Sequence, residues 1–463
     1  MFVGARDGIV GRSLPQWQRQ YGGLSADLVA ALDWSFCSEG DAMLGVELCA
    51  SVPLQVIELG MMGAFCTRIE TALELLDNVV NTAKKERNEA RLACMWVLAT
   101  THVSLPRERR MPMAARMARI CDDAVPVDER PLVLAAQCVA AFGVGDYTSI
   151  GPLAERARSV GRERSYRADL ATQLLQLLAD RWSALSLHFR GLHRQAREHA
   201  VKTLESGLPS GSTQTLGPIS LQVAMGVVLA RIDWFEGAAD AALARAMQVA
   251  SLAEDEHPLG LAMTLGLALA PIALWRGDEA LARDTVEKLD ALAKRHALSF
   301  WCEWARYMRT LVLPAGAGNE VQEEGPDLAA APPLMLELLA SVRPEVLSDD
   351  LLEGAAGALW CGPEARRAMA ERAHAKGIPS ADVEAGLTRA FVQAQAQGAL
   401  AWELRCAMSI ARLWRANGRT DEAAALLHNV LARFHQGYET ADLRAASALH
   451  KDLVRGQNNA GHA

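Results

Sequence analysis

The sequence predicts an all-α protein, built as a solenoid of helical hairpins that winds into a right-handed superhelix. Three observations predict this fold. A glycine that separates two apolar helical patterns recurs at a nearly fixed period in the 40s. Small residues flank that glycine at constant offsets, and no stretch shows the alternation of a half-buried strand. Because a single hairpin cannot bury its own apolar faces, a stack of hairpins is needed to form the core.

The clearest hairpin surrounds Gly418. Apolar residues recur at helical spacing on both sides of this glycine, which interrupts the pattern. Ala411 lies seven residues before it and Ala423 five residues after it. Small side chains at these positions let two helices approach closely, and the glycine relieves the backbone at the turn. We expect Thr420 to cap the second helix and Thr440 to cap the helix after it.

The same offsets recur upstream. Three glycines carry alanine at both offsets: Gly191 with Ala184 and Ala196, Gly237 with Ala230 and Ala242, and Gly277 with Ala270 and Ala282. Their spacings are 46 and 40 residues, and Gly418 follows Gly277 by 141 residues, which is three periods of 47. Gly145 fits less well, because Cys138 and Ile150 occupy its offsets.

The strength of the repeat pattern predicts the domain organisation. We expect an array of helical repeats over residues 1–313. Residues 314–333 are rich in proline, glycine, alanine and acidic residues, which predicts a linker or a long loop. Further helical repeats are expected over 334–455. The polar tail at 456–463 is expected to be disordered.

Composition excludes several classes of protein. The 463 residues are 51% hydrophobic and only 5% aromatic, which favours buried helices over strands. The net charge of −8 argues against direct binding to nucleic acid, which usually requires a basic domain. The nine cysteines are scattered without metal-ligand spacing, so we expect buried, reduced thiols in a cytoplasmic protein. The N-terminus shows no signal peptide.

One apolar stretch is long enough to resemble a membrane span. Residues 258–275 carry no charge. However, Pro271 lies near the end of this stretch, and the turn glycine Gly277 follows it where the first helix of a repeat is expected to end. We therefore interpret the stretch as a helix buried within the array and expect no membrane segment.

Motifs that would indicate catalysis are absent from the sequence. There is no GxxxxGK[ST] phosphate loop, no GxSxG elbow and no HExxH zinc motif. We therefore expect no catalytic residues, no cofactor and no metal ion, although an enzyme built on a helical array remains an alternative. His188, His193 and His199 lie near one hairpin and allow a metal site, but surface and cap positions explain them better.

Particular stretches resemble a known family. The offsets around each glycine resemble those of the tetratricopeptide repeat, and Trp414 matches its first-helix aromatic position. Residues 402–449 are similar to the C-terminal end of large bacterial signalling proteins. In those proteins a winged-helix DNA-binding domain or a nucleotide cyclase domain precedes a STAND-type ATPase module and a long tetratricopeptide-like array. The motifs that match are Trp402-Glu403-Leu404-Arg405, Ala411-Arg412-Leu413-Trp414 and Tyr438-Glu439-Thr440-Ala441-Asp442-Leu443. Residues 260–301 and 17–36 are also similar.

The resemblance covers the array region of that family and not its DNA-binding, cyclase or ATPase modules. It implies a non-catalytic sensor or scaffold array of a bacterial signal-transduction or transcriptional regulator. Such an array would bind a protein partner or a small ligand in its concave groove. The alternative is a truncated remnant of such a regulator without an independent function.

In tetratricopeptide-like stacks the first helix of each hairpin lines the concave side. Mapped from the turn glycines, the residues expected to bind in this groove are Arg231, Trp234, Phe235, Trp275, Arg405, Arg412 and Arg415. Arginines bind carboxylates or phosphates, and aromatic rings supply contact area. The alternative is that these arginines are solvated helix formers and that Trp234 and Trp275 belong to the core.

Overall fold

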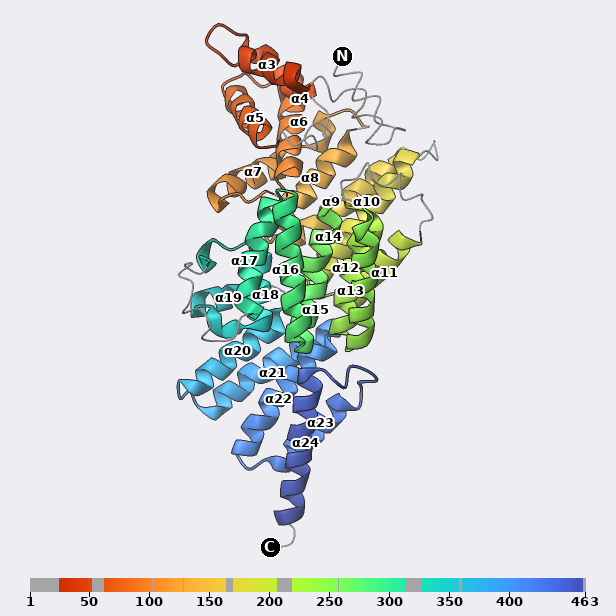
Figure 1. Cartoon of the computed structure of the whole chain (residues 1–463), viewed down its shortest axis with the longest axis vertical. Coiled ribbons are helices and arrows are strands. Elements are labelled where there is room, and N and C mark those ends of the chain that lie inside the picture. Colours follow the sequence, from red (N-terminus) through yellow and green to blue (C-terminus); the bar gives the residue numbers. More distant parts are fainter. Residues whose placement is uncertain are drawn as a thin grey trace. The chain divides into compact units, whose positions relative to one another are not determined.

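We analysed a computed structural model of the chain. It describes residues 25–51, 62–101, 103–127, 129–163, 170–205, 219–256, 258–312, 326–357 and 360–460. These residues form helices joined by turns and loops, and there is no β-strand among them. The prediction of an all-α, tetratricopeptide-like array of hairpins is confirmed, because consecutive helices pack against each other in antiparallel pairs (Figure 1).

The helices follow one another with short connections. Those of the N-terminal part are α3 (Ser25–Ser35), α4 (Ala42–Ser51), α5 (Met62–Asp77), α6 (Ala83–Thr100), α7 (Arg107–Arg119), the 3₁₀ turn η3 (Asp122–Ala124), α8 (Arg130–Gly143), α9 (Tyr147–Glu163) and α10 (Leu170–Phe189). Those of the middle part are α11 (His193–Leu204), α12 (Leu221–Phe235), α13 (Ala239–Glu254), α14 (Pro258–Thr264), the π-helical η5 (Leu265–Leu269), α15 (Ala270–Arg276), α16 (Glu279–Arg295) and α17 (Ser299–Val312). Those of the C-terminal part are η7 (Leu328–Ala330), α18 (Pro333–Val342), η8 (Pro344–Val346), α19 (Asp349–Gly357), α20 (Gly362–Ala375), α21 (Ser380–Gln397), α22 (Leu400–Ala416), α23 (Thr420–Leu431) and α24 (Ala441–Ala460).

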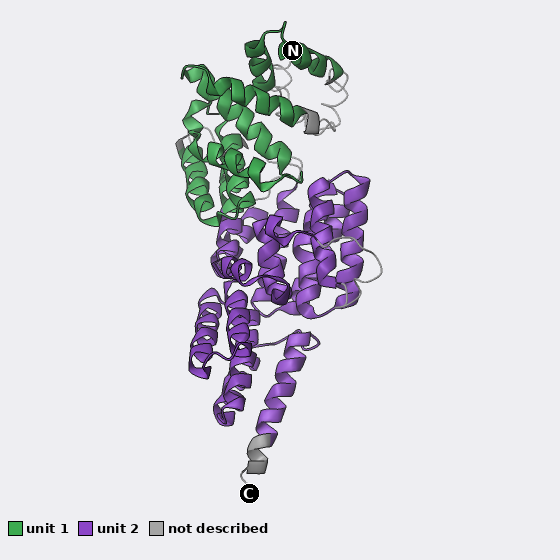
Figure 2. Ribbon diagram, turned by 90° about the vertical axis from the view of Figure 1, so that its left-hand side faces the viewer, with its two compact units in different colours: residues 1–182, 207–218 green, residues 183–206, 219–463 purple. Residues whose placement is uncertain are grey.

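The chain divides into two compact units (Figure 2). The first comprises residues 1–182 and 207–218, and the second comprises 183–206 and 219–463. The linker expected at 314–333 falls within the second unit and lies mostly outside the described residues, so that domain boundary stays a prediction. The tail differs from its expectation, because α24 continues to Ala460.

The turn glycines adopt the conformation that the repeat pattern requires. Gly145, Gly191, Gly237, Gly277 and Gly418 all have φ between 75° and 88°, in the left-handed region that glycine enters without a steric penalty. At each turn the glycine N–H bonds to the carbonyl three residues earlier, and the next N–H bonds to the carbonyl five residues earlier. This pair of bonds is the Schellman motif, which satisfies the last carbonyls of the preceding helix.

The small residues predicted beside these turns lie where the helices of each hairpin meet. All eight are fully buried, with no exposed surface: Ala184, Ala196, Ala230, Ala242, Ala270, Ala282, Ala411 and Ala423. Cys138 and Ile150, which occupy the same offsets around Gly145, are also buried. Larger side chains therefore fit at that hairpin, so the repeat depends on burial at the offsets rather than on alanine itself.

Two further turns were missed by the sequence pattern. Gly377 and Gly398 end α20 and α21 in the same left-handed conformation, so the turn before Gly418 lies only 20 residues upstream of it. A count of three 47-residue periods from Gly277 does not place these turns. The prediction for Thr420 was wrong: it is the first residue of α23, and no side chain caps that helix. Thr440 caps α24 as predicted, accepting a bond from the Leu443 N–H at 3.4 Å.

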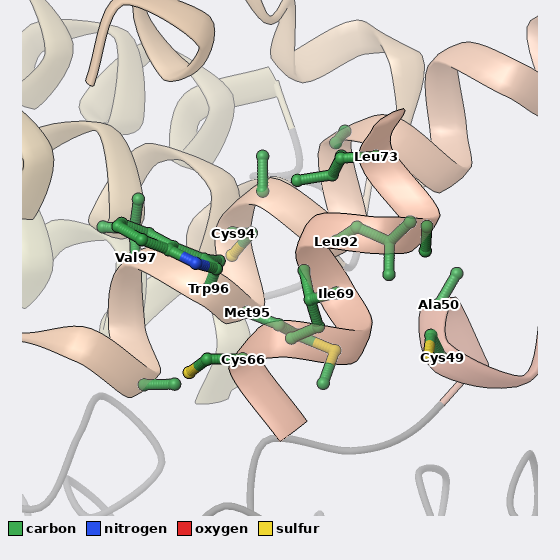
Figure 3. Packing of buried hydrophobic residues seen from close by; sticks show 14 of the residues in the cluster. Cys49, Ala50, Cys66, Ile69, Leu73, Leu92, Cys94, Met95, Trp96 and Val97 are labelled. Carbon is green, nitrogen blue, oxygen red and sulfur yellow. The ribbon is translucent and has the colours of Figure 1, made fainter. Parts of the chain in front are cut away.

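The core of the first unit is assembled from apolar faces of α3 to α8 (Figure 3). Ile69 on α5 and Leu92 on α6 are fully buried there. Trp96 is buried as well, and its indole N–H donates to Glu70 at 2.7 Å. Burial raises the pKa of the Cys66 thiol to about 11, so this thiol stays protonated at neutral pH. Six of the nine cysteines are buried as expected, whereas Cys37 and Cys121 are exposed.

The long apolar stretch forms α14, η5 and α15. It is the one helix among the described residues that is long and apolar enough to cross a membrane, and 78% of it is buried inside the protein. Pro271 has no N–H to donate to the carbonyls one turn earlier. Side chains replace that donor: the Trp304 indole N–H donates to the Gly266 carbonyl at 3.1 Å, and Arg231 donates to the Leu267 carbonyl at 2.9 Å. The π-helical segment is thus stabilised by its neighbours.

Within the second unit, C-terminal residues pack onto the turns of the middle hairpins. The loop at 432–440 places Gln436 against the start of α13, where its side-chain oxygen accepts from the Ala241 N–H at 2.9 Å. The Gly437 N–H donates to Asp240 at 2.8 Å. Because these contacts join residues almost 200 positions apart, the C-terminal hairpins close onto the middle hairpins instead of continuing the stack.

Candidate functional site

Five of the seven predicted groove residues come together in one buried cluster of the second unit. Arg231, Trp234 and Phe235 lie at the end of α12. Trp275 lies at the end of α15, and Arg405 lies on α22. We define the seam cluster as these five residues and the side chains packed around them, which are His188, Phe189, His193, Trp360 and Trp402.

The structure places the seven residues in two different environments. Arg231, Trp234, Phe235 and Trp275 are each at most 3% exposed and face the interior. Arg412 and Arg415 lie on the solvent side of α22. Partner binding by these residues stays a prediction. The alternative assignment of the two tryptophans to the core agrees with their burial.

Arg231 is surrounded by aromatic rings. Its guanidinium carbon lies 4.6 Å from the ring centre of Trp360, 5.2 Å from that of Trp275 and 5.4 Å from that of Phe189. Its Nε donates to Nε2 of His188 at 2.9 Å, in addition to the bond to the Leu267 carbonyl. Cation–π attraction is strongest where water is excluded, so the rings stabilise a charge that the protein interior would otherwise disfavour.

The two buried histidines form a directional chain of hydrogen bonds. His188 accepts at Nε2 from Arg231, so its proton lies on Nδ1, which faces Nδ1 of His193 at 3.2 Å. His193 must then accept at Nδ1 and carry its own proton on Nε2, a buried atom without a hydrogen-bond partner. Burial and the charge of Arg231 lower the pKa of both imidazoles, that of His193 to about 3. Both rings are therefore neutral at physiological pH.

Arg405 holds three elements of the second unit together. It donates to Asp442 of α24 at 2.7 Å, to Glu364 of α20 at 3.2 Å and to the Ser341 carbonyl of α18 at 2.9 Å. Burial opposes ionisation of Glu364, but the charges of Arg367 and Arg405 outweigh it and keep its pKa below the ordinary value. Each of these three polar contacts of Arg405 is therefore made within the protein.

The tryptophans also find their partners inside the cluster. The Trp275 indole N–H donates to the Ser341 hydroxyl at 3.1 Å, and that of Trp402 donates to the Trp360 carbonyl at 3.1 Å. The Trp360 indole N–H donates to the buried carboxylate of Glu337. These bonds satisfy the polar edge of each ring and leave its faces to pack, which is the arrangement of a well-ordered core.

A small depression borders the seam cluster. Trp234, Trp275, Phe434 and Asp442 contribute to its wall. Its interior volume of about 20 Å³ is room for about one water molecule. A metabolite needs a pocket of several hundred Å³, so this depression cannot enclose one.

The chemistry available in the cluster is limited. Cys361 lies beside it, but burial raises the pKa of this thiol well above its ordinary value, so it is a poor nucleophile at neutral pH. Within the described ranges, no three His, Cys, Asp or Glu side chains are placed to hold a metal ion. The cluster is equipped to fix α12, α15, α20 and α22 relative to one another.

Sequence reasoning missed several members of the cluster. Trp360 precedes α20 in a stretch without a clear repeat, so no periodic signal marked it. Glu364 was not singled out, although its position four residues after Trp360 places it one helical turn away. His188 was mapped to the groove and His193 was noted nearby, but only the structure places their rings in contact.

Comparisons with known proteins give no family for the chain. No protein-family model matches it, and no curated protein matches it. Among solved structures, a STAND protein with a tetratricopeptide repeat sensor from Pyrococcus horikoshii aligns over 98% of this chain and 74% of its own length. The alignment has 11% identity and a TM-score of 0.28. A circular tandem repeat protein aligns over 99% of this chain and 95% of its own, with 14% identity and a TM-score of 0.18. The assignment to helical-hairpin repeats therefore rests on the geometry described above.

Proposed function

We propose that the chain is a non-catalytic sensor or scaffold array of a bacterial signal-transduction or transcriptional regulator, and that it binds a protein partner. The regulator class comes from the resemblance of residues 402–449. The proposal places the chain in the cytoplasm, without a cofactor and without direct contact to nucleic acid or membrane. The fold supports a scaffold role, because stacked hairpins present a long surface whose shape is fixed by the core beneath it.

The observation that carries the proposal is the exposed pair Arg412 and Arg415. The two residues are three positions apart on α22, so their side chains share one face of the helix. Neither forms an ion pair with any described residue, in contrast to Arg405 on the same helix. In an acidic protein, two adjacent unpaired guanidinium groups suit an acidic segment of a partner protein.

A protein partner is favoured over a small ligand. The depression beside the seam cluster is too small for a metabolite, and the aromatic residues around it are already in contact with one another. Recognition by exposed side chains needs no pocket and can extend over several hairpins. The alternative, a remnant of a larger regulator with no function of its own, predicts a stable protein that binds no partner.

The test is affinity capture with the purified chain from an extract of its source organism, followed by calorimetry with the purified partner. Replacing Arg412 and Arg415 by alanine should weaken binding at least about tenfold. The matched control replaces Arg283 and Arg295 by alanine, which are exposed arginines of α16 in the same unit, and should leave the affinity unchanged. Equal affinity of both double variants would contradict the arginine surface, and the absence of any partner would support the remnant. Micromolar binding of ATP would reopen the enzyme alternative.

A further inference from the structure

Arg181 on α10 differs from the other arginines that lie away from solvent. Arg367 and Arg405 both pair with Glu364, and Arg231 bonds to His188 and to a backbone carbonyl. Arg181 makes no hydrogen bond or ion pair with any residue that the structure describes, and its Nε is buried without an acceptor. It therefore keeps its charge in the first unit without a counterion.

The surroundings of Arg181 supply no negative charge. The adjacent Asp180 is bound to Arg158 at 2.9 Å. Cys138 is the ionisable group that acts on Arg181, but burial raises the pKa of this thiol far above its ordinary value, so it is neutral. Desolvation in turn lowers the pKa of Arg181 to about 10, which still leaves the guanidinium charged at neutral pH.

Trp182 forms one wall beside the guanidinium. The guanidinium carbon of Arg181 lies 5.8 Å from the centre of its ring. The indole side chain is buried, and its Nε1–H has no acceptor. Two neighbouring residues thus hold hydrogen-bond donors that the chain does not satisfy, while the partly buried Arg181 remains within reach of solvent.

An unpaired cation and an unpaired indole N–H both cost free energy when they are withdrawn from water. An apolar side chain of similar length would avoid that cost, as the packing of α8 and α10 needs only bulk at this position. A group that accepts several hydrogen bonds and carries negative charge would remove the cost instead. Carboxylates and phosphates have this chemistry, and the guanidinium fork matches their geometry.

We propose that Arg181, flanked by Trp182, is a binding site for an oxyanion, either a carboxylate or a phosphate group, that comes from outside the described chain. The anion binds the guanidinium of Arg181 and lies against the edge of the indole ring. The source is either a small anion in solution or an acidic side chain of a peptide, and the two are separated by experiment. The site lies in the first unit and is independent of the arginine pair on α22.

The experiment uses the full chain labelled with 5-fluorotryptophan and followed by fluorine NMR. The resonance lost in a Trp182→Phe variant identifies Trp182. Inorganic phosphate, acetate and a hexaglutamate peptide are titrated separately at constant ionic strength. We expect at least one of them to shift the Trp182 resonance in a saturable manner, and Arg181→Met to weaken that binding at least about tenfold. The control Arg162→Met removes an exposed arginine of the same unit that is paired with Glu155, and should leave the titration unchanged.

Each outcome decides the proposal. Saturation by phosphate or acetate assigns the site to a small anion, and saturation by hexaglutamate alone assigns it to an acidic peptide. An unmoved Trp182 resonance with all three probes overturns the proposal, as does an equal response of Arg181→Met. Unfolding curves give a second readout: Arg181→Met should be at least as stable as the wild type, because an unpaired charge is removed. Marked destabilisation would mean that Arg181 has an internal partner, which also overturns the proposal.

Discussion

Two sets of turn glycines in the second unit have the same backbone and different surroundings. The middle set is Gly191, Gly237 and Gly277, and the C-terminal set is Gly377, Gly398 and Gly418. All six have φ between 67° and 88°. A Cβ added to the middle set would lie 2.6 to 2.8 Å from side chains of the C-terminal hairpins, namely Gln397, Leu400 and Ala441. A Cβ added to the C-terminal set would meet nothing within 4 Å.

The difference separates a local requirement from a tertiary one. The left-handed turn is a property of each hairpin and recurs wherever one helix ends and the next begins. The close approach at the middle turns exists because the C-terminal hairpins fold back onto them, with the seam cluster beneath. The covered turns therefore mark the junction that gives the second unit its core, and the open turns mark a free surface.

The largest expected effect distinguishes the junction from the surface of one helix, α22. Arg405→Met should destabilise the second unit by about 3–5 kcal/mol, because it leaves the buried carboxylate of Glu364 with one cation fewer. Arg412→Met on the same helix should change stability by less than about 0.5 kcal/mol, since its side chain is exposed and unpaired. Urea unfolding of both variants measures the difference. Equal effects would mean that Arg405 is not part of a buried junction.

The next effect compares the two kinds of turn directly. Gly418→Ala should cost about 1–2 kcal/mol, because alanine is strained in the left-handed conformation. Gly237→Ala has the same backbone cost and adds overpacking of about 1–3 kcal/mol against Leu400 and Phe434. Thermal unfolding at matched conditions should therefore rank Gly237→Ala as the more damaging change. The reverse order would contradict the packing of the C-terminal hairpins onto this turn.

Acid should weaken the junction through the buried histidines. In the unfolded chain a histidine binds a proton below about pH 6.5, whereas His193 in the cluster has a pKa of about 3. The unfolded state thus binds more protons between these values, and stability falls as the pH falls. From pH 7 to pH 5 the loss due to His193 is about 2 kcal/mol. Urea unfolding at both pH values should show a smaller loss, by about that amount, in a His193→Gln variant. An unchanged pH dependence in that variant would contradict the neutral, buried state of His193.

Sequence patterns predicted the local half of this structure. Glycine and alanine at fixed offsets identified Gly191, Gly237, Gly277 and Gly418 as turns, because a left-handed residue and a close helix contact depend on residues near one another in the chain. The pattern failed at Gly398, where the offset positions hold Phe391 and Glu403 in place of small residues.

The tertiary half could not be predicted from a repeat. Trp234 and Trp402 come from hairpins far apart in the sequence, and their ring centres lie 4.9 Å apart only because the C-terminal hairpins fold back. A groove mapped from one hairpin assumes that the stack continues, which exposes the concave side. At the junction the same side is covered, so Trp234 is buried, whereas Arg412 lies beyond the covered region and reaches solvent.

The central claim is that C-terminal residues lie directly on the middle turns, and the contact of Gly277 with Ala441 tests it most directly. A Cβ at Gly277 would lie 2.6 Å from the Ala441 Cβ, and the next nearest atoms are 3.7 Å away or more. A double-mutant cycle of Gly277→Ala and Ala441→Gly therefore isolates this contact. The account predicts that Ala441→Gly relieves the cost of Gly277→Ala by about 1 kcal/mol in urea unfolding. Strict additivity of the two changes would show that the C-terminal hairpins do not rest on this turn.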